Sequence, residues 1–171
     1  MQKVNHILIL LFVLVSCVGC DQATKLMARQ TLATAPMQEY AGGLFRFVYA
    51  ENPGAFLSLG ASLSVTARFW IFIVIAALLL VAVGIFALQF SQQTPPIIIV
   101  ALALVLGGGL GNLIDRIIYD GRVVDFMQVG IPRLRTGVFN VADMAIMAGV
   151  TIMLLTTLRR DQPSAVIENE G

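Results

Sequence analysis

The composition of this chain excludes a water-soluble fold. Of its 171 residues, 58% are hydrophobic and only 12% are charged, whereas soluble domains carry about 25% charged residues. The net charge of +1 offers no basic surface, so we expect no nucleic-acid partner. The length allows one domain, which we place at residues 1–160, followed by a polar tail at 161–171.

Four apolar segments are long enough to cross a membrane, which takes about 20 mostly apolar residues. They run from His6 to Gly19 with a helical continuation to Ala28, from Phe69 to Phe90, from Ile97 to Ile118, and from about Phe139 to Leu158. The sequence therefore predicts an all-α membrane fold with four transmembrane helices. Four crossings put the long connections at 30–68 and 119–138 on one side, and both termini on the other.

The two long connections differ in their patterns. The first contains the alternating run Leu44-Phe45-Arg46-Phe47-Val48-Tyr49, which is typical of a half-buried strand. We expect short strands there, lying at the membrane surface. We expect the second connection to be a loop.

The N-terminus permits a second interpretation. Lys3, an apolar run and the segment Leu14-Val15-Ser16-Cys17 are close to the lipobox of a bacterial lipoprotein. Cleavage before Cys17 would leave a lipid-anchored structural protein, although three further spans follow instead of a polar domain. Cys17 and Cys20 suggest neither a disulfide framework nor a metal site, and His6 is isolated.

Polar residues at membrane depth are functional candidates, because each charge there costs about 2.5–3.5 kcal/mol. Asp21 and Lys25 are four residues apart, so they share a helix face and can neutralise each other. Asn52 and Gly54 lie in the first long connection, where a turn between strands is the simplest interpretation.

The third span ends in a cluster of glycines and polar residues. Glycines 107, 108, 109 and 111 permit close approach of a neighbouring helix. Asn112, Asp115 and Arg116 share one helix face. Packing explains the glycines, but it does not explain an amide, an acid and a guanidinium together.

Two further acids suggest acid–base chemistry. Asp125 lies between apolar residues, and Asp143 lies about one turn into the fourth span with no Lys or Arg within a turn. Local capping would explain Asp143 alone. Two nearby carboxylates cannot both ionise easily, so one can act as a base while the other acts as an acid.

Two functions use such acids. A hydrolase would use them as a catalytic pair, since the chain offers no serine–histidine or cysteine–histidine pair. A small transporter or channel would use them as a proton relay. The inverted repeats or matched broken helices typical of a transporter are not seen in the sequence.

In chain order, the polar elements resemble the motifs of the lipoprotein signal peptidases, or signal peptidase II. The resemblance spans Asp21 to Asp143. It is carried by Asp21-Gln22-x-x-Lys25, Asn52-x-Gly54-Ala55, Gly111-Asn112-x-x-Asp115-Arg116, Val124-Asp125-Phe126 and Phe139-Asn140-x-Ala142-Asp143. Members of this family usually read Asn-x-Gly-Ala-Ala-Phe, whereas this chain has one alanine fewer, which leaves the register of Phe56 open.

The resemblance implies a membrane aspartic endopeptidase. Such enzymes cleave the signal peptide of prolipoproteins before a diacylglyceryl-modified cysteine, with a small β-structured cradle and a periplasmic loop beside the site. Asp125 and Asp143 would be catalytic. The residues that would bind substrate or support the site are Asn52, Gly54, Asn112, Asp115, Arg116, Asn140, Asp21 and Lys25. No metal or cofactor is implied, the partners are the precursor and membrane lipid, and we expect a monomer.

Orientation is where the resemblance and the charge pattern disagree. Cytoplasmic loops usually carry the excess of Lys and Arg. Here the side of the termini has Lys3, Arg159 and Arg160, and the other eight basic residues lie on the side of the long connections. The count puts those connections in the cytoplasm. The resemblance implies the opposite: an inner-membrane protein with its site near the periplasmic face and cytoplasmic termini and tail.

Overall fold

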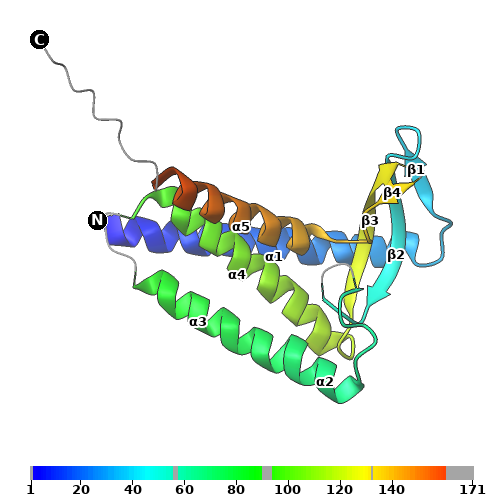
Figure 1. Cartoon of the computed structure of the whole chain (residues 1–171), viewed down its shortest axis with the longest axis horizontal. Helices are drawn as coiled ribbons and strands as arrows, with labels where there is room; N and C mark the ends of the chain where they lie inside the picture. The colour runs from blue at the N-terminus through cyan, green and yellow to red at the C-terminus, as the bar shows by residue number, and fades with distance from the viewer. Residues whose placement is uncertain (1, 56–57, 90–93, 132, 161–171) are drawn as a thin grey trace, which may run out of the picture.

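Helices form the body of the molecule, and a small sheet lies across one end of them (Figure 1). The computed structural model describes residues 2–55, 58–89, 94–131 and 133–160. The elements in chain order are α1 (Gln2–Leu32), β1 (Gln38–Tyr40), β2 (Phe45–Asn52), α2 (Val65–Phe69), the π-helical η2 (Trp70–Ile75), α3 (Ala76–Leu88), α4 (Pro96–Ile118), β3 (Val123–Ile131), β4 (Leu134–Arg135) and α5 (Val141–Arg160). Phe56 and the predicted tail at 161–171 lie outside the described residues.

Four helical segments in the described residues can cross a membrane by length and apolar composition. They are Val4–Leu32, Val65–Leu88, Pro96–Ile118 and Val141–Arg159. The prediction of four spans is confirmed, and the first of them is longer than expected. The helix continues past Ala28 to Leu32, and both residues pack with Phe126 beneath the sheet, a contact that local sequence does not reveal.

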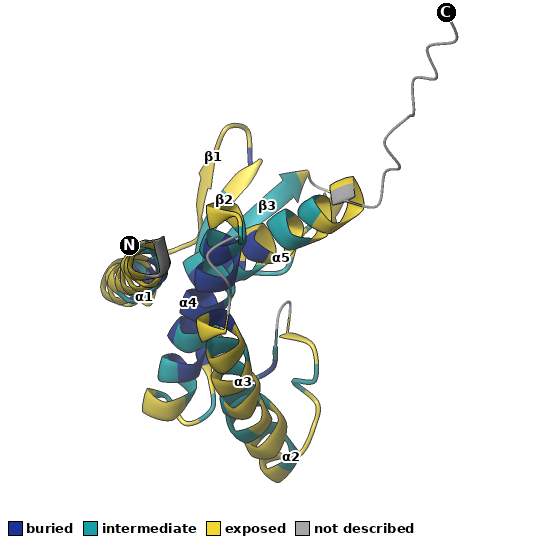
Figure 2. Ribbon diagram, turned by 90° about the vertical axis from the view of Figure 1, so that its left-hand side faces the viewer, coloured by how far each residue is buried: buried dark blue, intermediate teal, exposed yellow. Residues whose placement is uncertain are grey.

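Helix α4 is the centre of the bundle. It packs between α1 and α5, and α3 packs on it from a third direction (Figure 2). Its Ile99, Leu102 and Leu106 are buried, whereas α3 exposes large apolar side chains such as Leu78 and Leu79. An apolar outer surface is what lipid accommodates, so the lipid takes the place of a second protein layer.

The glycines of α4 allow the close helix contacts that the sequence predicts. A Cβ at Gly108 would collide with the carbonyl oxygen of Ala142 on α5, and a Cβ at Gly111 would lie 2.5 Å from Asp21 Oδ2 on α1. A Cβ at Gly107 would lie 2.8 Å from Cys17 Cβ on α1. Helix backbones can therefore approach closely where the polar residues of α1, α4 and α5 meet.

The sheet has the strand order β1-β2-β3-β4 with antiparallel neighbours. The strands expected in the first connection are present as β1 and β2. The expectation of a loop in the second connection is wrong, because that connection forms β3 and β4. Residues 123–126 of β3 are all buried, so the strand shows no alternation of apolar and polar residues there.

Candidate active site

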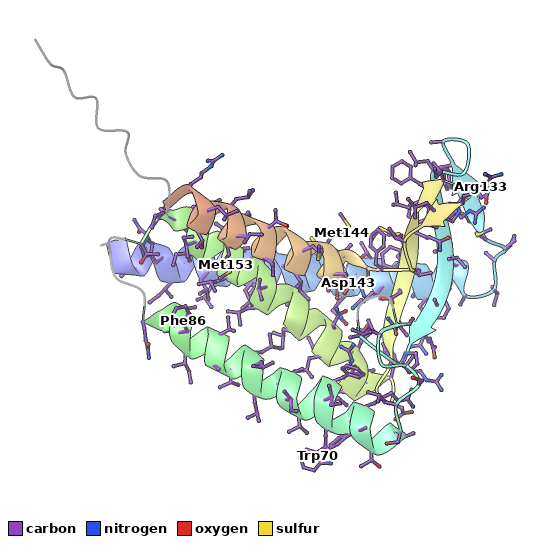
Figure 3. All side chains as sticks on the ribbon, in the orientation of Figure 1. Trp70, Phe86, Arg133, Asp143, Met144 and Met153 are labelled. Carbon is purple, nitrogen blue, oxygen red and sulfur yellow. The ribbon has the colours of Figure 1, made fainter. Side chains whose placement is uncertain are left out.

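The predicted site residues meet where the sheet lies against the helix ends. Asp125 comes from β3, Asp143 from the first turn of α5 (Figure 3), and Asn52 from the end of β2. Asn112 comes from α4, and Asn140 directly precedes α5. All five side chains are buried. Segments separated by up to 91 positions in the chain thus form one polar cluster in an otherwise apolar protein.

Asp125 is held by two asparagine side chains. Asn52 Nδ2 donates to Asp125 Oδ2 at 3.0 Å, and Asn140 Nδ2 donates to Asp125 Oδ1 at 2.7 Å. The pairing of β2 with β3 brings Asn52 alongside, because Ala50 pairs with Asp125 and Asn52 with Val123. Both carboxylate oxygens therefore have a donor, and neither donor is a cation.

Asn52 also shapes the turn that follows it. Its Oδ1 accepts from the Gly54 amide at 2.8 Å, and its Nδ2 donates to the Ala55 carbonyl at 2.9 Å. A Cβ at Gly54 would lie 2.6 Å from the carbonyl oxygen of Leu59, so this position requires glycine. The turn predicted for Asn52 and Gly54 therefore exists, and it also aims the Asn52 amide at Asp125.

Asp143 forms hydrogen bonds with Asn140 at the start of its own helix, and it also forms one with α4. Asn140 Oδ1 accepts from the Asp143 amide at 2.9 Å, and Asp143 Oδ2 accepts from the Asn140 amide at 3.3 Å, as in a capping box. Asn112 Nδ2 donates to Asp143 Oδ1 at 2.9 Å. Local capping and membership of the acid cluster are thus both present.

Asn140 connects the two carboxylates. Its side-chain nitrogen bonds to Asp125, and its backbone amide bonds to Asp143. The same nitrogen lies 3.1 Å from Asn112 Oδ1, which also accepts from Lys25 Nζ at 2.9 Å. The relative position of Asp125 and Asp143 is therefore set by rigid, short amide side chains.

A second cluster of charges lies beside the first. Lys25 Nζ is 2.8 Å from Asp21 Oδ2 and 3.0 Å from Asp115 Oδ2, and all three side chains are buried. Asp21 Oδ1 accepts from the amide of Ala142, and Asp115 Oδ2 from the amide of Val124. The cluster thus fixes α1 and α4 to the residues immediately beside Asp143 and Asp125.

Gln22 forms contacts with α4 that the sequence motifs did not predict. Its Nε2 lies 2.9 Å from Asp115 Oδ1 and 3.2 Å from the carbonyl of Gly111. The sequence does contain a sign of this role, because Gln22 lies between Asp21 and Lys25. A polar residue at that position belongs to the same stretch of helix as these two charges. Arg116 reaches the other side of the site, where Nη2 donates to the Gly54 carbonyl at 2.7 Å.

Burial raises the pKa of Asp125 to about 6. The Asn52 hydrogen bond opposes this shift, the charge of Asp143 adds to it, and the Asn140 bond and Lys25 also oppose it. A carboxyl with such a pKa can lose or gain a proton near neutral pH. Within the described ranges, no group of three or more His, Cys, Asp or Glu side chains is positioned to hold a metal ion.

Four helices able to cross a membrane, with buried amide-held carboxylates where they meet the sheet, define an integral membrane protein with a polar site at one end. The family model described as signal peptidase (SPase) II matches residues 13–159. The chain therefore belongs to the signal peptidase II family, as the motifs predicted, and it is a multi-pass bacterial membrane protein and a hydrolase.

Relatives and solved structures agree with this assignment. The chain is 36% identical over 145 residues to a lipoprotein signal peptidase of Geobacter sulfurreducens, covering 85% of this chain and 88% of the relative. It is 38% identical over 133 residues to a protein of the same name from Moorella thermoacetica, covering 78% and 81%. A structure described as a bacterial membrane enzyme, 28% identical, superposes with a TM-score of 0.72 over 95% of this chain and 94% of that one.

Proposed function

We propose that this chain removes signal peptides from bacterial prolipoproteins and that Asp125 and Asp143 carry out the hydrolysis. Membership of the signal peptidase II family gives the reaction class. The observation that supports the pair is Asn140, which bonds to Asp125 through its side chain and to Asp143 through its backbone. Each carboxylate also has an amide donor of its own, Asn52 for Asp125 and Asn112 for Asp143.

The chemistry requires one carboxylate in each protonation state. The ionised aspartate takes a proton from water as the water oxygen adds to the scissile carbonyl carbon. The protonated aspartate then donates its proton to the nitrogen of the cysteine as the carbon–nitrogen bond breaks. The products are a signal peptide with a free carboxylate and a mature protein with a free amine on its lipid-modified cysteine.

The remaining predicted residues support this pair. Asn52, Asn112 and Asn140 orient the carboxylates, and Arg116 holds the Gly54 turn beside them. Asp21, Lys25 and Asp115 fix the surrounding backbone through the amides of Ala142 and Val124. We propose a monomer as the working unit, with the precursor and membrane lipid as its partners.

The direct test uses purified protein and a prolipoprotein with a diacylglyceryl-modified cysteine. We expect a cut at the bond immediately before that cysteine, and no cut in the same precursor without the lipid. If neither precursor is cleaved by folded protein, the assignment fails and the proton-relay alternative gains support. Proton flux into sealed vesicles containing the protein would then be the next measurement.

We further propose that the sheet and the site face the periplasm of the inner membrane, with both termini in the cytoplasm. All the polar clusters lie at the sheet end, whereas the N-terminus and the end of α5 lie at the opposite end (Figure 1). Five of the basic residues at the sheet end are bonded within the protein, namely Lys25, Arg46, Arg116, Arg122 and Arg135. Their distribution is therefore explained without a cytoplasmic location.

Reporter fusions test this orientation. A reporter that is active only in the periplasm should work after Gly60 and should not work after position 92. The reverse pattern would place the site in the cytoplasm and restore the orientation that the count of basic residues favours.

A further inference from the structure

One face of the sheet is largely apolar at the end formed by β1, β4 and the adjoining parts of β2 and β3. Directly paired residues point to the same face, and so do residues two apart on one strand. Phe47 pairs with Met127, while Phe45 pairs with both Tyr40 and Val129. Alternation beyond Val129 adds Ile131, and Ile131 pairs with Leu134. The face therefore carries Phe47, Met127, Tyr40, Phe45, Val129, Ile131 and Leu134. Two polar residues share it: Gln38, which pairs with Phe47, and Asp125, which lies two positions before Met127.

The helices cover only one part of this face. Phe47 and Met127 pack against the buried cluster formed by Ala28 and Leu32 of α1 with Phe126. Figures 1 and 2 both show the end of the sheet with β1 extending past the helices. Side chains of the apolar face at that end are exposed: Tyr40 by 54%, Phe45 by 44%, Ile131 by 58% and Leu134 by 75%. We name this end, with Arg133 between Ile131 and Leu134, the sheet tip.

The height of the sheet relative to the membrane follows from α5. This helix has 20 residues, which at about 1.5 Å per residue give a length of about 30 Å, close to the thickness of the hydrocarbon layer. Its first residue, Val141, packs in the same cluster as Phe47 and Met127. The sheet therefore lies at the boundary of the hydrocarbon, and its apolar face points toward the bilayer.

The charges of the sheet tip suit a lipid surface. Arg133 is exposed and lies at the far end of the sheet (Figure 3). Arg135 Nη1 donates to the carbonyls of Gly43 and Gly130, which joins the two hairpin turns. The acid near them, Glu39, pairs with Arg46. Among the described residues, Arg133 has no acidic partner. An arginine between apolar side chains matches anionic headgroups above acyl chains.

We propose that the sheet tip binds the lipid surface of the leaflet on its side, with Tyr40, Phe45, Ile131 and Leu134 in the interfacial layer and Arg133 on anionic headgroups. The tip is continuous with β2 and β3, which carry Asn52 and Asp125. Lipid contact at the tip and helix contact at Phe47 and Met127 then support the sheet on both sides. The lipid surface thus becomes part of what holds Asp125 at a fixed depth.

Fluorescence of single tryptophans tests this contact in the full-length protein. The chain has one tryptophan, Trp70 in η2, so a Trp70→Phe background is free of tryptophan. Leu134→Trp and Tyr40→Trp then report on the tip. Gln128→Trp is the matched control, because Gln128 pairs with Arg46 and so lies on the opposite face. Each variant is reconstituted into phosphatidylcholine–phosphatidylglycerol vesicles with or without bromine near the top of the acyl chains.

We expect bromine to quench the Leu134→Trp and Tyr40→Trp variants several-fold more than the Gln128→Trp variant, with cleavage of the lipid-modified precursor retained. Omitting phosphatidylglycerol should reduce the quenching of Leu134→Trp, and adding Arg133→Gln should remove that dependence on anionic lipid.

Equal quenching of all three variants, or none at the tip, would overturn the proposal. So would a Leu134→Trp emission that responds to the precursor and not to brominated lipid, because the face would then belong to the substrate. Two tip variants are used so that loss of folding in one leaves the other as the test.

Discussion

Two pairs of buried aspartates lie side by side in this molecule, and their carboxylates have different kinds of partner. Asp21 and Asp115 share one cation, with Lys25 Nζ 2.8 and 3.0 Å away. Asp125 and Asp143 accept hydrogen bonds from amides alone in the part of the chain that the structure describes. A cation favours the ionised state of an acid, whereas neutral amides fix its position with a smaller effect on its proton.

The difference separates structural acids from acids that can react. Breaking a buried ion pair is costly, so we expect Asp21, Lys25 and Asp115 to serve the stability of the fold. In the proposed reaction, the amide-held pair would keep its geometry while a proton moves between carboxylate and water. The following predictions test this division, in order from the largest expected effect to the smallest.

Removing the proton-exchanging groups should have the largest effect. We expect Asp125→Asn and Asp143→Asn each to reduce the turnover of a lipid-modified precursor by at least about 10²–10⁴-fold, the usual value of general acid–base catalysis. Because the two act as a unit, the double variant should be little worse than either single one. Purified variants should be compared at equal amounts of folded protein.

The control is Asp120→Asn, which makes the same chemical change outside the site. Asp120 is exposed and has a φ of 52°, a conformation that asparagine also tolerates, so this variant should keep most of its activity. Near-normal turnover by Asp125→Asn or Asp143→Asn would exclude that residue from the catalytic pair.

Removing the shared cation should damage stability first. Lys25→Met leaves Asp21 and Asp115 buried without their partner, so we expect it to lower the free energy of unfolding by about 3–5 kcal/mol. Thermal unfolding in detergent would measure this loss. The triple variant Asp21→Asn, Lys25→Met, Asp115→Asn should be less destabilised than Lys25→Met. A normal unfolding temperature with no cleavage would instead place Lys25 in the catalytic chemistry.

The rate of the reaction should depend on pH through Asp125. With Asp125 as the base of the pair, acidification below its pKa of about 6 protonates it and removes the ionised carboxylate that the reaction needs. We expect kcat/KM to fall on the acid side with a midpoint near pH 6. Asn52→Ala removes a hydrogen bond that lowers this pKa, so its midpoint should move to higher pH. A midpoint near the ordinary value of 3.8 in both proteins would contradict the assignment.

An exposed ion pair should matter least. Arg122 Nη1 and Glu51 Oε2 are 2.8 Å apart at the surface, where such pairs contribute about 0–1 kcal/mol. Arg122→Gln should therefore change the unfolding temperature little and leave the cleavage of the precursor intact. A loss comparable to that of Lys25→Met would show that burial is not what distinguishes the two ion pairs.

Local sequence predicted the spans well, because each is a continuous apolar run whose length matches a bilayer. It did not predict β3, where Val123, Val124 and Phe126 are buried around Asp125. A strand covered on both sides lacks the alternation that marks β2. The end of α1 at Leu32 was also beyond local sequence, because it depends on packing against the sheet.

The site residues were predictable as a set, since polar groups in an apolar chain are conspicuous. Their partners were not. The spacing of Asp21 and Lys25 indicated one ion pair, but Asp115, which shares the same ammonium group, stands on another helix. The capping expected of Asp143 and its place in the acid pair turned out to be compatible, because Asn140 serves both.

The continuity of α1 has a consequence for the enzyme's own lipobox-like segment. A peptidase that cuts before cysteine must act on an extended peptide, yet Leu14-Val15-Ser16-Cys17 lies inside one helix from Gln2 to Leu32. Leu14 packs against the core and Cys17 is buried against Gly107. Self-cleavage would require unwinding the first span and emptying that contact. In the folded protein, this lipobox-like segment is therefore not available as an extended peptide.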